Sequence, residues 1–313
     1  MEPVTNQKQQ RLPLPFDSGL LYSIVAIYYV YVSQILIKFH LNDAINLVLS
    51  EVAFFALPPL LLALVRKYDI KKTFRLKAPK PLEVLIMLGI SPVMVIAGFC
   101  AGFLALMGVK AIFGRVCLTG EVANYMSQGL LTSMLLIAVL PAICEELLFR
   151  GMIQRGLERL GAGWGIFLSG LLFGLFHFDF QRLAAQMIIG FIAAYAVYRT
   201  GSIFNGMILH FMNNGLLTLL SNYSVKAAEG TATQIVADPF ETTEFQLLAE
   251  QYNMTLEQLL GLLAIVLSVT LVFSLIVVFG LLLILRTITK NTAEKPEIIR
   301  GSGKGFIMGI PGL

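Results

Sequence analysis

Charged residues are scarce in this chain of 313 residues. They make up 13% of it, whereas soluble domains usually carry about 25%. Hydrophobic residues make up 57%, and the mean hydropathy is +0.79. A soluble globular domain and a disordered chain are both excluded, because neither contains so much apolar sequence. The chain is therefore predicted to be a polytopic membrane protein.

Cysteine is also sparse. The chain has only three, Cys100, Cys117 and Cys144, all in apolar or nearly apolar stretches. An odd and sparse set gives no disulfide framework. The zinc-protease motif H-E-x-x-H is absent from the sequence as well, so the common helical zinc site of metalloproteases is not predicted.

The long apolar runs dominate the sequence instead. A membrane-spanning helix needs about 20 mostly apolar residues. Eight such runs, one of them short, occur at residues 19–38, 44–66, 82–108, from 130 onwards, 163–178, 183–199, 202–220 and 259–285. The predicted fold is an all-α bundle of about eight transmembrane helices.

The basic residues between these runs indicate an orientation. If the N-terminus is cytoplasmic, 18 of the 23 Lys and Arg residues lie on the cytoplasmic side, as the positive-inside rule requires. Both termini are then cytoplasmic, and the loop 222–257 is outside. The rule also explains the basic segment 66–80, so no nucleic-acid partner is predicted. The expected divisions are a cytoplasmic segment 1–18, a membrane domain 19–286 and a cytoplasmic tail 287–313.

Ionisable side chains in the predicted membrane helices are costly and are therefore candidates for function. Glu51 stands alone in the second helix, and we expect it to be structural and paired with a buried donor. Glu146 and Arg150 are four residues apart on one helix face and are expected to form an ion pair. Glu145 points about 100° away from Glu146. A carboxylate without a counter-charge in apolar surroundings suits general-base catalysis.

Two later helices carry the other candidates. His177 ends an F-x-x-x-H segment whose glycines, on the same face, allow another helix to approach closely. His210 and Asn214 lie one turn apart. At 1.5 Å per residue, Glu145 and His177 lie roughly 21 Å from the same membrane face. Asn214 is at a similar depth and His210 is one turn shallower, so a shared site is favoured over packing alone.

Together, these segments resemble the motifs of a known family. E-E-x-x-x-R at 145–150, F-x-x-x-H at 173–177 and H-x-x-x-N at 210–214 are intact and in family order. They are similar to those of the CAAX-protease and bacteriocin-processing enzymes (CPBP, also called Abi). The eukaryotic relatives of these enzymes include the Ras-converting prenyl-protein endopeptidase. The resemblance covers about residues 129–220, the expected catalytic core, and implies intramembrane hydrolysis of a peptide bond.

The resemblance also implies a role for each residue. Glu145 and His177 would hold and activate a water molecule, and His210 and Asn214 would stabilise the oxyanion. The neighbouring Glu–Arg pair would have a supporting role. Members of the family are often labelled metalloproteases, and Glu145, His177 and His210 would suit zinc with one position open for water. A glutamate-activated water needs no ion, and we favour this metal-free alternative.

The implied partners are membrane lipid and a peptide or protein substrate. The substrate is either a prenylated C-terminus or a bacteriocin or signal-peptide precursor, and the compact chain is typical of a prokaryotic cell membrane. A cysteine protease using Cys144 is disfavoured, because Cys144 and Glu145 diverge around the helix. A non-catalytic immunity or scaffold protein and a proton-coupled transporter remain alternatives, since buried Glu and His also form proton relays.

Overall fold

The structure is a computed structural model that describes residues 12–38, 42–116, 129–227, 240, 242–294, 296–299 and 303–309. Every regular element within these residues is helical, which confirms the all-α prediction. Parts of the predicted terminal segments and outer loop lie outside the described residues, as does Cys117. These parts are residues 1–11, 228–239, 241, 295, 300–302 and 310–313.

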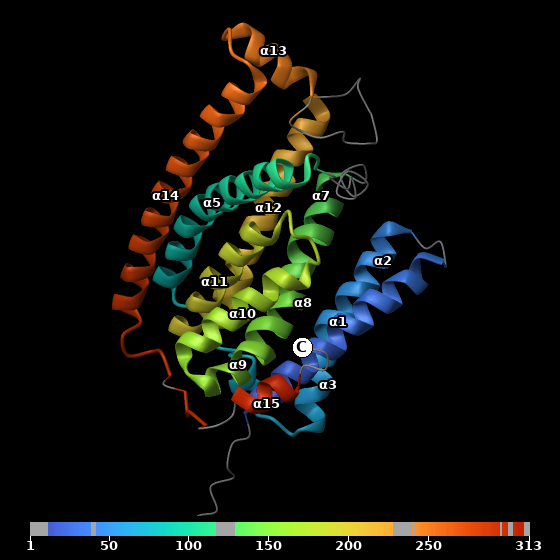
Figure 1. The fold of residues 1–313 in the computed structure, drawn as a ribbon. Helices are drawn as coiled ribbons and strands as arrows, with labels where there is room; N and C mark the ends of the chain where they lie inside the picture. Colours follow the sequence, from blue (N-terminus) through green and yellow to red (C-terminus); the bar gives the residue numbers. More distant parts are fainter. Residues whose placement is uncertain are drawn as a thin grey trace, which may run out of the picture.

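The helices form an elongated bundle (Figure 1). The first part contains α1 (Pro15–Lys38), α2 (Asp43–Ser50), the π-helical η1 (Glu51–Ala56), α3 (Leu57–Val65), α4 (Ile70–Thr73) and α5 (Pro81–Phe113). One interrupted helix follows, made of α7 (Leu130–Ser133), the π-helical η2 (Met134–Val139), α8 (Leu140–Glu146), the π-helical η3 (Leu147–Ile153), α9 (Gln154–Leu157) and the 3-10 turn η4 (Glu158–Leu160). The remainder is α10 (Ala162–Phe176), α11 (Leu183–Thr200), α12 (Ile203–Ala227), α13 (Thr243–Gln251), α14 (Leu256–Ile288) and α15 (Gly303–Met308).

Six helical stretches are long and apolar enough to cross a membrane, so the chain has the helices of a multi-pass membrane protein. They are Asp43–Val65, Pro81–Phe113, Leu130–Leu160, Leu183–Thr200, Ile203–Tyr223 and Leu256–Ile288. α10 is apolar but has only 15 residues. It rises about 22 Å, which is less than the ~30 Å hydrocarbon core. α1 is not among the six either, so of the eight predicted spans six are confirmed within the described residues.

Glycines let α10 and α11 pack closely. A Cβ atom on Gly170 would collide with the ring of Phe191, and one on Gly190 would lie 2.7 Å from the carbonyl oxygen of Gly170. The small residues that precede His177 therefore serve the contact between α10 and α11, as their spacing indicated. His177 itself lies beyond this contact, as the residue that caps the C-terminus of α10.

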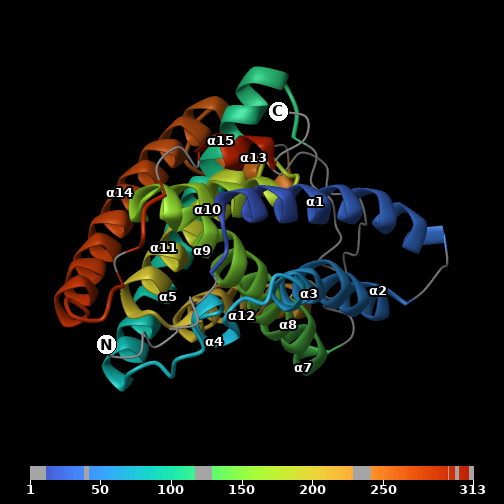
Figure 2. The same cartoon turned by 90° about the horizontal axis from the view of Figure 1, so that it is seen from below.

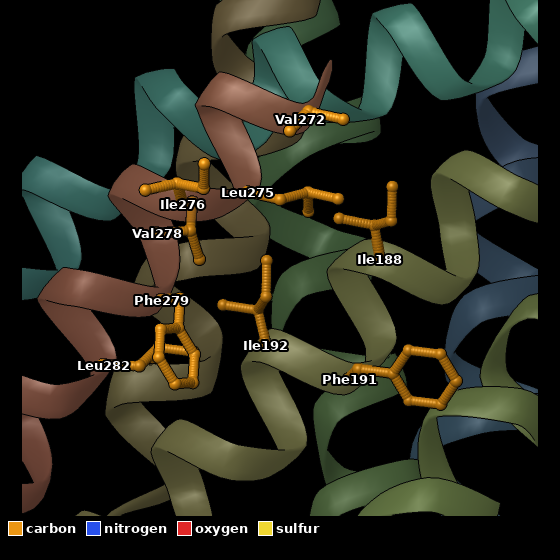
Figure 3. Close-up of a pocket in the computed structure, with 9 residues that line it drawn as sticks. All are labelled: Ile188, Phe191, Ile192, Val272, Leu275, Ile276, Val278, Phe279 and Leu282. Atoms are coloured by element: carbon orange, nitrogen blue, oxygen red, sulfur yellow. The ribbon is translucent and has the colours of Figure 1, made fainter. Parts of the chain in front are cut away.

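A wholly apolar groove of about 500 Å³ lies between α11 and α14 (Figure 3). Its walls include Phe191 and Ile192 from α11 and Phe279 from α14, and none of the candidate catalytic residues lines it. An exposed apolar surface of this kind suits contact with lipid chains.

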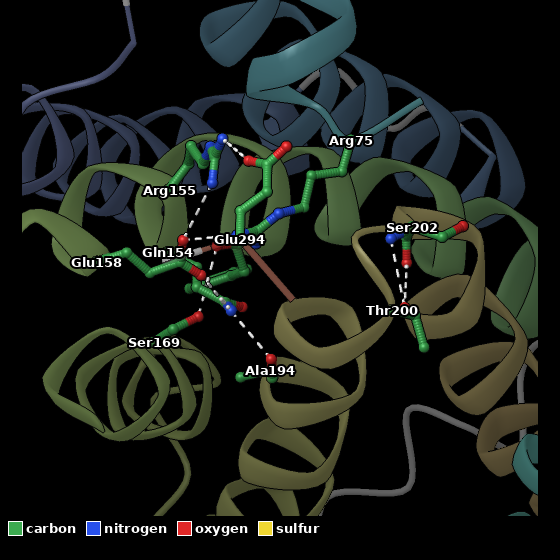
Figure 4. Close-up of polar contacts among 10 residues, drawn as sticks. Arg75, Gln154, Arg155, Glu158, Ser169, Ala194, Thr200, Ser202 and Glu294 are labelled. Carbon is green, nitrogen blue, oxygen red and sulfur yellow. Dashed lines mark hydrogen bonds and ion pairs between the residues drawn. The ribbon is translucent and has the colours of Figure 1, made fainter. Parts of the chain in front are cut away.

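A buried polar network joins α9 to the segment before α5 and to the C-terminal part of the chain (Figure 4). Glu158 lies 2.5 Å from Arg75 and 3.3 Å from Arg155, which also contacts Glu294 at 2.7 Å. Burial raises the pKa of the Glu294 carboxyl, but the hydrogen bond and charge of Arg155, with the charges of two other basic residues, hold that pKa below its usual range. Because α15 also packs against α1, the chain after α14 is docked on the bundle.

The orientation of the bundle can be tested at its two ends. α4 faces the viewer in the view from below (Figure 2), whereas α13 lies at the far end (Figure 1). Lys71 on α4 and Glu244 on α13 are both exposed. In a cysteine-free background, we expect an impermeant thiol reagent added outside intact cells to label Glu244→Cys. Lys71→Cys should react only after the cells are opened, and the reverse pattern would contradict the cytoplasmic placement of the termini.

Candidate active site

Glu146 is the centre of a buried polar cluster. Its Oε1 atom lies 2.9 Å from Nη1 of Arg150 and 3.1 Å from Nδ1 of His210. The side chains of Glu146 and Arg150 are fully buried, and that of His210 is only 4% exposed. The predicted Glu146–Arg150 pair is therefore present, and it has a third member from α12. Since one carboxylate oxygen serves both partners, Glu146 fixes the ring of His210 as well as neutralising Arg150.

Arg150 has further contacts that explain how a fully buried cation is tolerated. Its Nη2 atom donates to the carbonyl oxygen of Gly190 at 3.3 Å. Its guanidinium carbon lies 4.4 Å from the ring centroid of Phe173, a cation–π contact. Arg150 thus links η3 to α10 and α11 and holds together the helices that carry the candidate residues.

Phe173, the first residue of F-x-x-x-H, lies between the two histidines. Its ring centroid is 5.1 Å from that of His177 and 5.7 Å from that of His210, both in edge-to-face contact. The Nδ1 atom of His177 lies 2.9 Å from the carbonyl oxygen of Phe173. A carbonyl can only accept, so Nδ1 carries the hydrogen and Nε2 of the neutral ring presents its lone pair. His177 can therefore accept a hydrogen bond from water at Nε2.

Asn214 is oriented by two hydrogen bonds. Its Nδ2 atom donates to the carbonyl oxygen of Ile137 at 3.0 Å, and the side chains of Asn213 and Asn214 are joined at 3.0 Å. Pro141 has no N–H to donate to the carbonyl four residues earlier, which is that of Ile137. The amide of Asn214 supplies a donor for this carbonyl. One of the two amide hydrogens on Nδ2 is used in this bond, and the second is available for a substrate oxygen.

A cavity of about 470 Å³ extends from Asn214 between α5, α11 and α12. α5 contributes an apolar wall that includes Phe99 and Phe103, and Arg182 lies at the start of α11. Asn213 also lines this cavity. Asn213 is not among the candidates named from the sequence, although it directly precedes Asn214.

Glu145 is positioned differently from the other candidates. It is only 8% exposed, and its Oε2 atom has no hydrogen-bond partner. Among the described residues, no hydrogen bond joins it to His177, His210 or Asn214. The charge of Glu145 acts on that of Glu51 instead, across the contact between α8 and η1. The Oε2 atom of Glu51 has no hydrogen-bond partner either, so the expected pairing of Glu51 with a buried donor is not found at this atom.

Residues 127–216 match the sequence model of a protein family described as type II CAAX prenyl endopeptidase, Rce1-like. All three motifs lie within this match. The chain contains a CAAX endopeptidase domain of this family. The match leaves α1 to α5 and α13 to α15 outside it, and no curated protein and no solved structure matches the chain. Membership of the family implies intramembrane protease activity, and the resemblance seen in the sequence is confirmed.

Glu145, His177 and His210 are the residues that could hold a metal ion in this domain. Zinc with an open position requires three ligand side chains that converge on one point. In the described stretches of the chain, no three His, Cys, Asp or Glu side chains converge in this way. The Nδ1 atom of His210 faces Glu146. The described arrangement of Glu145, His177 and His210 thus does not fit zinc with an open position, because the three side chains are not brought together as one ligand set.

The backbone around the candidate site departs from regular α-helix. α8, which carries Glu145 and Glu146, is flanked by η2 and η3 in its own helix and packs against η1. π-helical turns are rare and occur frequently at functional sites, because the wider turn redirects side chains. Helical spacing in the sequence could not predict these turns. They decide which neighbours each side chain of α8 meets.

Proposed function

We propose that this chain is an intramembrane endopeptidase that hydrolyses a peptide bond with a water activated by Glu145 and His177. One observation carries the proposal. Beside a cluster in which Glu146 pairs with Arg150 and His210, the adjacent carboxyl of Glu145 is buried and has an oxygen without a partner. A buried carboxylate whose accepting oxygen is free can take a proton from water.

The proposed reaction begins with the water. Nε2 of His177 accepts a hydrogen bond from it, and Glu145 accepts its proton as the water oxygen bonds to the peptide carbon. The electron pair of the carbonyl bond moves onto the oxygen. The second amide hydrogen of Asn214 and an N–H of His210 donate to this oxyanion. Glu146 supports His210, because a carboxylate at Nδ1 stabilises a positively charged ring, which then donates from Nε2.

The proposed substrate is a peptide or protein with a prenylated C-terminus, as the family description indicates. The apolar wall that α5 gives to the cavity beside Asn214 supports an apolar peptide segment at this place. A bacteriocin or signal-peptide precursor is the alternative substrate. The proposed setting is a prokaryotic cell membrane, with both termini in the cytoplasm.

A cleavage assay with purified protein tests the proposal. We expect the protein to release the C-terminal fragment of a farnesylated CAAX peptide, as detected by mass spectrometry. The same peptide without the prenyl group and a bacteriocin leader peptide distinguish the substrate classes. Folded protein that cleaves none of these peptides would favour the alternatives, an immunity or scaffold protein or a proton-coupled transporter.

Replacement of Asn214 tests the oxyanion assignment. Asn214→Ala is expected to lower kcat by ~10²–10³-fold and to leave KM nearly unchanged, because the donor acts only when negative charge develops. Steady-state kinetics on the farnesylated peptide measures both constants. Asn205→Ala is the matched control, since Asn205 is a buried amide of α12 that donates to Glu83. It should alter stability and not kcat, and a rise in KM alone for Asn214→Ala would contradict the assignment.

A further inference from the structure

Glu51 and Glu145 form a pair of buried carboxyl groups on two different helices. Their residues are 5% and 8% exposed, and an Oε2 atom of each has no hydrogen-bond partner. η1, which begins with Glu51, packs against α8, which carries Glu145. The charges of the two groups act on each other. Two buried acidic side chains thus interact electrostatically across packed elements, and the mechanism described above uses only one of them.

Among the described residues, no basic side chain forms an ion pair with Glu51. The elements packed against η1 are α1, α2, α3, α8 and η3. The ionisable side chains of these elements include Tyr28 and Tyr29, whose rings pack on Phe54 of η1, and Asp43, Cys144, Glu145, Glu146 and Arg150. Asp43 is exposed at the start of α2, and Arg150 is held by Glu146. The positive charge of Arg150 acts on the carboxylates of Glu145 and Glu146, both on α8. Glu51 is therefore left with another carboxyl group as its charged neighbour.

Two neighbouring carboxylates are unfavourable in apolar surroundings, and of these two only Glu145 feels the positive charge of Arg150. Each charge loses its hydration on burial, and like charges repel strongly where the dielectric constant is low. The pair avoids both costs when it carries one proton and a single negative charge. A membrane protein that retains such a pair at its active site gains nothing in stability from it, which indicates a functional role.

The geometry points to a second catalytic carboxyl group: we propose that Glu51 holds the proton that the leaving amine requires. This inference rests on the proposed function. Glu145 first accepts the proton of the attacking water. The carbon–nitrogen bond then breaks, its electron pair stays on nitrogen, and the nitrogen takes the proton from Glu51. Transfer of a proton from Glu145 to Glu51 restores the starting state, so one water is consumed and no other reactant is required.

The role of Glu51 can be separated from that of Glu145 with two substrates. One is the farnesylated peptide, and the other is its ester analogue, in which oxygen replaces the nitrogen of the scissile bond. An alkoxide leaves with less need of a proton than an amide nitrogen does. We expect Glu51→Gln to lower kcat by ~10²–10³-fold on the peptide, within the range for a general acid, and much less on the ester. Glu145→Gln should be impaired on both substrates, because both need an activated water.

Infrared spectroscopy of the resting enzyme gives a readout that does not depend on turnover. Wild-type protein is expected to show the carbonyl stretch of a protonated buried carboxyl, and Glu51→Gln should lose this band. The variant should not unfold at a lower temperature than the wild type, because a neutral amide replaces a protonated and therefore neutral carboxyl group. Glu83→Gln is the control, since Glu83 is a buried carboxyl group that accepts from Lys80 and Asn205 outside the site.

The outcomes distinguish this inference from the proposed function. Full peptide activity of Glu51→Gln, an equal loss on peptide and ester, or a lowered unfolding temperature that accounts for the loss would each overturn the role of Glu51. A wild-type protein that cleaves neither substrate would refute the proposed function itself. In that case, retention of the infrared band in Glu51→Gln would still refute the protonated pair.

Discussion

Glu145→Gln is expected to reduce peptide hydrolysis by at least ~10²–10⁴-fold, the usual contribution of a general base. The amide has the shape of the carboxylate, but it cannot accept a proton from water. The protein should remain folded, because Oε2 of Glu145 has no hydrogen bond to lose and a neutral amide costs less to bury than a carboxylate. Measurements of kcat/KM on the farnesylated peptide and of the thermal unfolding temperature test the two parts of this prediction.

The control for this variant must remove a buried carboxylate without touching the site. Glu83→Gln does so, because Glu83 lies at the first turn of α5 and is 2% exposed. Its kcat/KM should be that of the wild type. If Glu145→Gln hydrolyses the peptide at the wild-type rate while folded, Glu145 is not the base, and the water must be activated elsewhere.

The main expected effect of Glu146→Gln is a loss of stability. It leaves the guanidinium of Arg150 buried without its counter-charge, and breaking such a pair costs ~3–5 kcal/mol of unfolding free energy. The side chains of both partners are fully buried, so water cannot replace the lost contact. The variant should show a lower thermal unfolding temperature and a reduced yield of folded protein. Activity should fall too, because an uncharged amide replaces the carboxylate beside Nδ1 of His210.

A double variant separates the two roles of Glu146. Replacing both partners of a buried ion pair by apolar residues is often neutral for stability. Glu146→Leu with Arg150→Met should therefore unfold closer to the wild-type temperature than Glu146→Gln does, although His210 still lacks its carboxylate. We therefore expect the kcat/KM of this double variant to stay well below that of the wild type. A Glu146→Gln protein of wild-type stability and no activity would show that Glu146 acts in the chemistry and not in support.

Local sequence patterns determined much of the candidate site. The low content of charged residues and the long apolar runs required membrane helices, because the hydrocarbon core admits few ions. The spacing of Glu146 and Arg150 fixed their ion pair, since residues four apart share a helix face whatever the rest of the fold does. The glycines before His177 predicted a close helix contact for the same reason. These features depend on helix geometry alone.

Contacts between distant helices were decided only by the tertiary structure. Helical spacing gives the face on which a side chain lies, but not the helix that this face meets. The bond from His210 to Glu146, the donation from Asn214 to Ile137 and the encounter of Glu51 with Glu145 all join separate helices. The π-helical turns around α8 shift the faces by part of a turn, which no regular period predicts. The sequence therefore determined the residue types of the candidate site and their local pairs, and packing determined which residues of separate helices form hydrogen bonds or interact through their charges.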